Sequence, residues 1–503
     1  MFRTNSFFAA PALVLLMGGT AHAALTADQV WQSWKDGATM GDVAITAATE
    51  SNSGGVLTLN GVSIAPKGAD AVFSISDMTL TEENDGSVTI RPGATIGLDT
   101  TPSGNNAMKI GVQHDGLTIT AREDGDALVY DFNANMLNVN FDAAIEGYAF
   151  DADKPAPITK TTGEISLQGL NGSYSDAAGA NRTFGLDLAA TEFSYDFISD
   201  DPGMESKSSG TSQTADFAMG VDVTLPTSIS MTELESSAGF QQALQEGFAV
   251  AATFSQGVTN GSSKEENQFF PFDMTMSSQP GKGTVVFNKD LFSMQSVGSG
   301  MQFNMNTASL PTPIEISMAE FSVNYVLPML ATAPADFTVQ TKISQLVLND
   351  GVWGLFDPSA VLQREPFDLN IDVTGKSTMD VMGLIVASET GGNPPIPAPE
   401  AVNINDISLK VAGAALDAVG AFTFDNSMGV PMPLGEATVN VSGANALIDG
   451  LIKIGLVQEQ DAMGVRMMMG MFMVPGADAD SLTTKIEAKE GFSILVNGQP
   501  LPM

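Results

Sequence analysis

The chain has 503 residues, of which 43% are hydrophobic and 16% charged, and its 58 acidic and 21 basic residues give a net charge of −37. It contains no cysteine and two histidines, which excludes disulfides, thiolate nucleophiles, Cys-based zinc sites and a His-rich catalytic metal site within one chain. So strong a negative charge repels nucleic acid and anionic lipid headgroups at long range, and we expect no nucleic acid as a partner.

The chain starts with the pattern of a secretory signal peptide. Arg3 is followed by an apolar run from Phe7 to Met17 and then by the small-x-small sequence Ala21-His22-Ala23. Because the run is too short to span a bilayer, we expect cleavage after Ala23 and export to the periplasm. No later run of apolar residues is long enough for a transmembrane helix, so the sequence predicts none in the mature chain.

The mature chain begins with a predicted helix. Thr26 and Gln29 fit a capping box, and Val30, Trp31 and Trp34 then fall on one helical face. Trp31 and Trp34 have two interpretations. They anchor the helix on a sheet as core residues, or they form an exposed contact patch for a protein partner.

From Val43 onward, apolar and polar residues alternate in short runs, such as Leu128, Tyr130 and Phe132. Asn60-Gly61 and Asp124-Gly125 supply tight turns between the runs, so the sequence predicts antiparallel strands with one apolar face. Residues 232–248 interrupt this pattern with a short helix, and residues 389–400, rich in Gly and Pro, form a linker or long loop. We divide the mature chain into β-rich regions at residues 24–330 and 331–503.

The sequence offers little support for an enzyme. The mature chain keeps only His114 for a Ser-His-Asp triad, and Asp115-Gly116 after it favours a histidine at a loop tip. Acidic residues are so numerous that sequence spacing selects no carboxylate pair for a glycosidase. We therefore expect a protein that is not an enzyme and that needs no cofactor and no metal.

Residues 443–473 contain two predicted helices, and the second is rich in methionine, a flexible side chain that adapts to varied apolar shapes. Both helices are apolar over more than one stripe, so we expect this helical hairpin to be buried on more than one side or to cover a cavity. It either forms a lid over a groove for an apolar ligand or fills the open end of a sheet. The candidate ligand-binding residues are Leu447, Leu451, Met467, Met471 and Met473.

Three segments carry a resemblance to a known family: Asn349-Asp350-Gly351-Val352-Trp353-Gly354-Leu355-Phe356-Asp357-Pro358 with Arg364-Glu365-Pro366, residues 411–426, and Leu495-Val496-Asn497-Gly498-Gln499. With the Trp-bearing start after a signal peptide, the chain resembles the exported alphaproteobacterial family called domain of unknown function 2125. This resemblance implies no activity and no functional residues. The many antiparallel strands also resemble, in architecture only, envelope proteins of the AsmA kind, which are associated with lipid handling.

The predicted fold class is mainly β, with one or two long curved antiparallel sheets, an N-terminal helix, a short mid-chain helix and a C-terminal helical hairpin. The leading functional hypothesis is a non-enzymatic periplasmic envelope protein that binds lipid or another apolar ligand along the concave face of its sheet. The alternative is a structural or protein-docking module of the cell envelope that holds no ligand.

Overall fold

The computed structural model of the protein describes residues 24–40, 43–66, 71–94, 96–100, 106–147, 156–234, 236–330, 333–393, 397–491 and 493–501. The chain divides into two compact units: unit 1 contains the residues up to Thr227 and Ser263–Pro271, and unit 2 contains Ser228–Ser262 and the residues from Phe272 onward. The predicted signal peptide, residues 1–23, lies outside the described residues. The division predicted between residues 330 and 331 falls inside unit 2.

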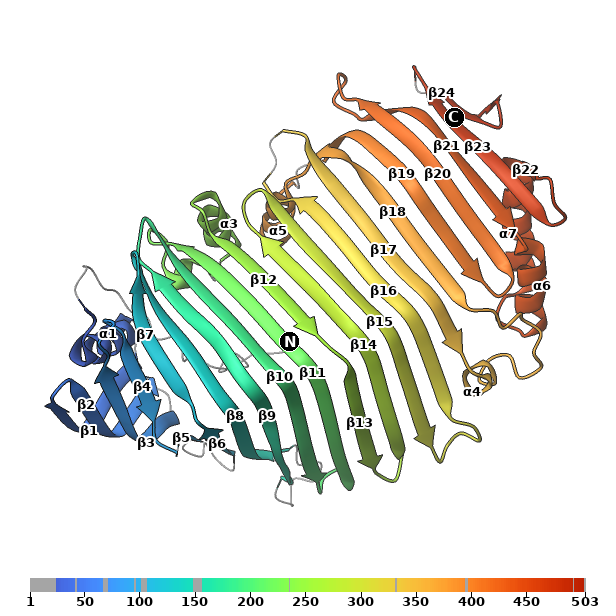
Figure 1. Cartoon of the computed structure of the whole chain (residues 1–503). Coiled ribbons are helices and arrows are strands. Elements are labelled where there is room, and N and C mark those ends of the chain that lie inside the picture. The colour runs from blue at the N-terminus through green and yellow to red at the C-terminus, as the bar shows by residue number, and fades with distance from the viewer. Residues whose placement is uncertain are drawn as a thin grey trace. The chain divides into compact units, whose positions relative to one another are not determined.

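Unit 1 begins with a helix and continues as strands that pair antiparallel with one another (Figure 1). Its elements are α1 (Ala27–Met40), β1 (Val43–Ser53), β2 (Val56–Pro66), β3 (Ala71–Glu82), β4 (Val88–Pro92), β5 (Ile96–Thr100), β6 (Ala107–Asp115), β7 (Thr118–Asp124), β8 (Ala127–Glu146), β9 (Ile158–Ala177), β10 (Asn181–Asp201) and β11 (Ser206–Pro226).

The start of α1 confirms the predicted capping box. The Thr26 hydroxyl accepts a hydrogen bond from the Gln29 N–H at 3.2 Å, and the Gln29 side-chain oxygen accepts one from the Thr26 N–H at 2.9 Å. These two reciprocal bonds satisfy backbone donors that the first helical turn would otherwise leave unpaired.

The core of unit 1 lies between α1 and strands β1–β4. Trp31 and Trp34 are 2% and 6% exposed, and they pack with Leu59, Leu80 and other buried side chains of these strands. The Trp34 indole N–H donates a hydrogen bond to the Tyr130 hydroxyl at 3.1 Å. The two tryptophans therefore lie in the core of unit 1 and do not form an exposed contact patch.

Unit 2 is also built from antiparallel strands, with short helices between them. Its elements are α2 (Met231–Leu234), α3 (Ser237–Gln245), β12 (Ala249–Gln256), β14 (Phe272–Phe287), β15 (Leu291–Thr307), β16 (Ile314–Pro328), β17 (Ala335–Leu348), α4 (Asp350–Trp353), β18 (Phe367–Thr378), α5 (Val381–Thr390), β19 (Ala398–Val411), β20 (Ala414–Asp425), β21 (Met432–Ser442), α6 (Ala444–Lys453), α7 (Glu459–Phe472), β22 (Val474–Pro475), β23 (Ser481–Lys489), β24 (Ser493–Val496) and β25 (Gln499–Pro500). Strand β13 (Thr259–Glu266) has residues in both units.

The helices of unit 2 lie at the borders of its strands. Figure 1 shows α3 and α5 at one end of the strands, and α6 and α7 beside the last ones. The mainly β antiparallel fold with an N-terminal helix, a mid-chain helix and C-terminal helices is thus confirmed. The mid-chain helix is broken into α2 and α3 because Ser236 caps a new helix, accepting a hydrogen bond from the Gly239 N–H at 3.1 Å.

Phenylalanine rings lie over glycines of neighbouring strands in both units. Phe132 pairs with Gly172, and a Cβ added to this glycine would lie 2.5 Å from the ring. The same arrangement joins Phe141 with Gly163, Phe197 with Gly210, Phe254 with Gly283 and Phe337 with Gly375. Each ring covers a position where glycine would otherwise weaken the strand.

Candidate apolar-ligand site

Strand register in unit 2 collects apolar side chains into rows on one side of the sheet. Residues directly opposite each other in antiparallel strands project to the same side. One row crosses β16 to β23 and consists of Phe321, Ile343, Leu369, Leu409, Leu416, Val441 and Leu482. A second, parallel row consists of Met294, Tyr325, Val339, Val373 and Ile404. We call this side of the sheet the apolar face.

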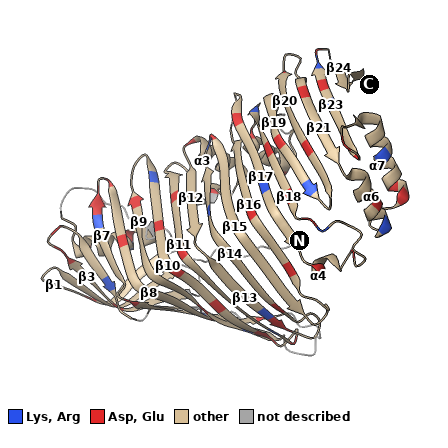
Figure 2. Cartoon of the chain, turned by 45° about the vertical axis from the view of Figure 1, so that its right-hand side comes forward, with Lys and Arg blue, Asp and Glu red and all other residues tan. Residues whose placement is uncertain are grey.

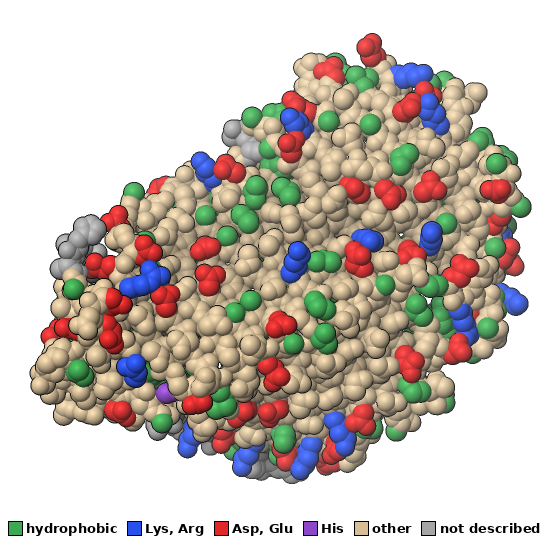
Figure 3. All heavy atoms as spheres, in the orientation of Figure 1, with side chains coloured by type: hydrophobic (Ala, Val, Ile, Leu, Met, Phe, Trp, Pro, Cys, Tyr) green, Lys and Arg blue, Asp and Glu red, His purple; other side chains and the backbone are tan. Residues whose placement is uncertain are grey.

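The opposite side of the same strands is polar. The row next to Leu369 consists of Ser322, Lys342, Asn370, Ser408, Asp417, Asn440 and Thr483. These side chains bond to one another: Asn440 donates to Asp417 at 2.8 Å and Thr483 donates to Asn440 at 2.7 Å. Figure 2 shows acidic and basic residues scattered along strands of unit 2, and Figure 3 shows charged side chains scattered over one face of the molecule. Unit 2 is therefore a sheet with one apolar and one polar face.

The apolar face is only half-buried. Phe321, Ile343, Leu369, Leu409 and Leu416 all keep part of their surface in contact with solvent, whereas Leu59 and Leu80 in the core of unit 1 are 0% exposed. The helices of unit 2 lie at the ends and the edge of the strands, as Figures 1 and 2 show. The face thus presents a largely apolar surface, on which the hydroxyls of Tyr325 and Thr341 bond to each other, and such a surface is of the kind that marks an interaction or ligand-binding site.

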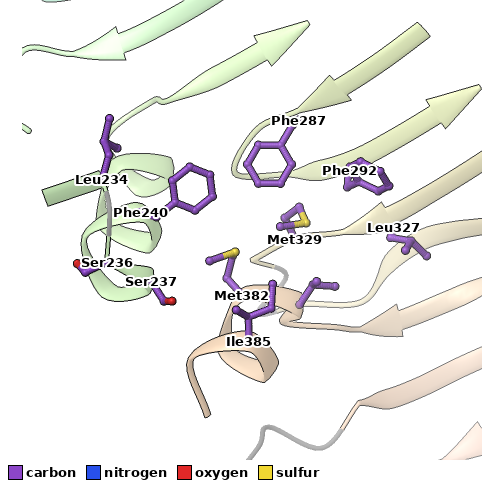
Figure 4. A pocket seen from close by; sticks show the side chains of 11 residues that line it. Leu234, Ser236, Ser237, Phe240, Phe287, Phe292, Leu327, Met329, Met382 and Ile385 are labelled. Atoms are coloured by element: carbon purple, nitrogen blue, oxygen red, sulfur yellow. The ribbon is translucent and has the colours of Figure 1, made fainter. Parts of the chain in front are cut away.

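At one end of the apolar face, α3 and α5 enclose a pocket of about 400 Å³. We call it the α3–α5 pocket, and Figure 4 shows its side chains converging on a common space. The lining consists of Leu234, Ser236, Ser237, Phe240, Phe287, Phe292, Leu327, Met329, Val381, Met382 and Ile385. Phe240 of α3 stacks on Phe287 of β14, with ring centroids 5.6 Å apart, and this contact holds the helix over the strand end.

The polar side chains of the pocket lining are already engaged. The Ser236 hydroxyl donates to the Glu233 carbonyl at 3.1 Å in addition to capping α3. The Ser237 hydroxyl of α3 donates to the Glu389 carboxylate of α5 and so links the two helices. The remaining lining side chains are hydrocarbon or thioether, which leaves the pocket suited to an apolar occupant.

The predicted helical hairpin consists of α6 and α7. Arg466 of α7 forms an ion pair with Asp449 of α6 at 2.5 Å. Leu447 and Leu451 of α6 pack toward the buried Trp353 and its neighbours. These two predicted ligand-binding residues therefore contribute to a small core at the edge of the sheet.

Most methionines of α7 face solvent and not the core around Trp353. Met467 and Met471 are each 64% exposed, Met463 is 71% exposed, and Met473, just after the helix, is half-buried. The expectation that this stretch is buried on more than one side or covers a cavity is wrong for α7, because α7 buries only its small Ala462 side. The five predicted ligand-binding residues therefore do not line one site: Leu447 and Leu451 belong to a core, whereas Met467 and Met471 face solvent.

His114 lies near the end of β6, and its Nε2 is 3.1 Å from the Gly93 carbonyl oxygen. This contact occupies the nitrogen that would serve as the base of a triad. The expectation of a histidine at a loop tip is wrong, because His114 is a residue of β6 and pairs with Leu137 of β8.

The motif around Trp353 forms a corner of unit 2. The Asn349 side chain caps α4 by accepting a hydrogen bond from the Val352 N–H at 3.1 Å. Asp357 is 0% exposed, and its two carboxylate oxygens accept hydrogen bonds from the N–H groups of Val361 and Leu362, both at 2.9 Å. These hydrogen bonds hold the chain in place at this corner of unit 2.

Sequence reasoning missed the α3–α5 pocket because it missed α5. Val381–Val386 is apolar on all sides apart from Gly383, so it shows neither a helical stripe nor strand alternation. The available signal was Asp380 as an N-cap, whose carboxylate accepts a hydrogen bond from the Gly383 N–H at 2.7 Å, together with Gly391 in a left-handed conformation at the helix end.

No helix among the described residues is both long enough and apolar enough to cross a membrane. A search of the curated proteins finds no match to this chain. A family model described as "Uncharacterized protein conserved in bacteria (DUF2125)" matches residues 282–495. The match runs from β14 to β24 and includes most of the apolar face, the corner around Trp353 and the α6–α7 hairpin. The match confirms the predicted resemblance to this family over residues 282–495.

Proposed function

We propose that the protein is a non-enzymatic, periplasmic envelope protein that binds lipid or another apolar ligand on the apolar face of unit 2. The observation that carries the proposal is the continuous row from Phe321 to Leu482, which is apolar in every strand that it crosses and only half-buried. Exposed hydrocarbon of this extent is unfavourable in water at about 25 cal/mol per Å², so a bound hydrocarbon ligand would stabilise the protein.

The periplasmic location rests on the signal-peptide pattern that ends at Ala23. The strong negative charge supports a ligand that is recognised through its hydrocarbon portion, since anionic headgroups would be repelled. Export is tested by the mass of protein isolated from the periplasm. We expect a chain that begins at Ala24, and recovery of the full-length chain from the cytosol would contradict the location.

Ligand binding is tested by extracting the purified protein with organic solvent and analysing the extract by mass spectrometry. We expect lipid in a fixed ratio to wild-type protein and less of it from Leu369→Gln, which places an amide on the apolar face. The matched control is Asn370→Gln, the adjacent residue of β18 on the polar face, which should retain the wild-type amount. A lipid-free wild-type protein, or equal loss in both variants, would contradict the proposal.

The alternative is a docking module without ligand, and the observation that favours it is the exposed methionine side of α7. Met463, Met467 and Met471 are spaced at four-residue intervals, so they lie along one side of the helix. Under this alternative, extraction of the wild-type protein yields no lipid, and replacing the three methionines with glutamine abolishes binding to a protein of the cell envelope. Under the lipid proposal, Leu369→Gln reduces lipid recovery.

A further inference from the structure

We propose that the α3–α5 pocket takes the methyl-end segment of one uncharged hydrocarbon chain, whose remaining length lies on the apolar face. This inference rests on the proposed function. It adds the place where the hydrocarbon chain of the ligand ends and the chemical nature of that end.

The pocket is a direct continuation of the apolar face. Phe292 lies two residues from Met294 on β15, and Leu327 lies two residues from Tyr325 on β16, so each pair projects to the same side. Phe287 is paired with Phe292, and Phe292 with Leu327. These three side chains form the next row beyond Met294 and Tyr325. A chain lying along the face therefore reaches the pocket without crossing a polar row.

The polarity of the lining selects a chain end without polar groups. The hydroxyls of Ser236 and Ser237 are engaged with Glu233, Gly239 and Glu389. A peptide or a carboxyl group placed in the pocket would lose its hydrogen bonds to water without replacement, which costs on the order of 1–3 kcal/mol for each neutral group. A methyl end loses nothing of this kind, so it enters and the polar end stays outside.

Charge around the lining disfavours an anionic ligand. Glu233, Asp380 and Glu389 flank the lining residues of α2, α3 and α5, and Lys289 lies in the turn between β14 and β15. Hydrogen bonds from the Ser230 backbone N–H and hydroxyl lower the pKa of Glu233, which keeps that carboxylate ionised at neutral pH. Acids outnumber the base at this site, so a carboxylate headgroup gains no net attraction here.

The size of the pocket fits one chain segment. Its volume of about 400 Å³ lies near the lower end of the range of about 300–1,000 Å³ that is typical of small-molecule pockets. Met329 and Met382 supply flexible side chains on two sides of this space, as Figure 4 shows. Methionine adapts its shape to the occupant, which allows chains that differ in length or branching to enter.

The test uses hexadecanol with a diazirine at its methyl end as the probe. After photolysis of the full chain with this probe, peptide mass spectrometry should find the label on residues that line the pocket, such as Met329 and Met382. Label confined to the middle of the apolar face, for example on Leu369 or Leu409, would overturn the pocket assignment while leaving the proposed function in place. Lipid recovery from the wild-type protein, measured as above, tells this failure from a failure of the proposed function.

Variants of Ile385 test whether the pocket itself receives the chain end. Ile385 lines the pocket and is 42% exposed, so Ile385→Trp should fill the space and abolish labelling of Met329 and Met382 without unfolding the protein. Ile385→Phe, a smaller change, should reduce the labelling and serves if the tryptophan variant does not fold. Leu355→Trp is the control, because Leu355 is 57% exposed and lies outside the pocket. Unchanged labelling in folded Ile385→Trp would overturn the proposal.

Competition determines the chemistry of the chain. Unlabelled dodecanol should prevent labelling at lower concentration than dodecanoate, which has the same chain length and a negative charge. If dodecanoate competes better than dodecanol, the site recognises a carboxylate and the assignment to an uncharged chain is overturned.

Discussion

The α1-covered sheet of unit 1 and the apolar face of unit 2 are made from the same kind of strand but are covered differently. In unit 1, α1 buries Leu59, Leu80 and Ile90 completely. In unit 2, the rows of the apolar face remain half-buried, because the helices lie at the borders of the strands. Strand alternation therefore predicts which side of a sheet is apolar but not which element covers that side.

The largest expected difference in stability is between a Leu→Ala substitution in the core of unit 1 and one on the apolar face of unit 2. Leu80→Ala, at a side chain that is 0% exposed, should lower the free energy of unfolding by about 2–5 kcal/mol, because it removes buried methyl groups and leaves a cavity. Leu369→Ala on the apolar face should lower the free energy of unfolding by only about 1 kcal/mol, because part of this side chain is already in contact with water. Urea denaturation of ligand-free protein measures both values, and equal losses would mean that the apolar face is a covered core.

The second contrast concerns glycines within the strands. Gly172→Ala should destabilise by about 1–3 kcal/mol, because the added Cβ would lie 2.2 Å from the Asp187 carbonyl oxygen and 2.5 Å from the Phe132 ring. Gly111→Ala in β6 is the matched change, and nothing lies within 4 Å of its added Cβ. We expect Gly111→Ala to stabilise by about 0.5–1 kcal/mol in the same denaturation experiment. The reverse order would contradict the packing of phenylalanine over glycine.

The buried corner of unit 2 around Asp357 should make the stability of the protein depend on pH. Burial raises the pKa of Asp357, but the Val361 and Leu362 N–H groups and the charges of Arg364 and Lys453 outweigh it and lower the pKa below its ordinary value. A lowered pKa means that the ionised carboxylate stabilises the fold above about pH 4 and that this contribution is lost as the pH falls through the folded-state pKa. Asp357→Asn should therefore be less stable than wild type at pH 7, and the difference should shrink in acid.

The measurement for Asp357 is urea denaturation at a series of pH values. Asp336→Asn serves as the control, because its side chain is 84% exposed and should give little difference at any pH. A difference between Asp357→Asn and wild type that stays constant from neutral pH to pH 2 would contradict the role assigned to the ionised carboxylate.

Much of the fold could be predicted because its signals are local. The capping box of Thr26 and Gln29 marked α1, and alternation with Asn-Gly and Asp-Gly turns marked antiparallel strands. The interpretation of Trp31 and Trp34 as core residues was correct, but the sequence alone did not distinguish it from exposure of both side chains at an interface. That distinction depends on the strands against which α1 packs.

The candidate site could be predicted only in part, because it depends on register between strands far apart in the chain. The apolar face requires Leu369 to lie opposite both Ile343 and Leu409, and no single segment contains that information. The methionines of α7 suggested a buried helix by composition, yet they lie outward because α6 packs on the corner core through Leu447 and Leu451. The composition of α6 and α7 showed that both helices are rich in apolar side chains. Only tertiary packing determines which of these side chains are exposed.

Because the chain contains no cysteine, a single introduced thiol can report whether a ligand binds on the apolar face. Leu369→Cys and Asn370→Cys place one thiol each on the apolar and the polar face of β18, and each can carry an environment-sensitive fluorophore. Titration with dodecyl maltoside below its micelle-forming concentration should shift the emission of the label at 369 to the blue and saturate, while the label at 370 stays unchanged. Equal shifts at both positions, or none at 369, would contradict ligand binding on the apolar face.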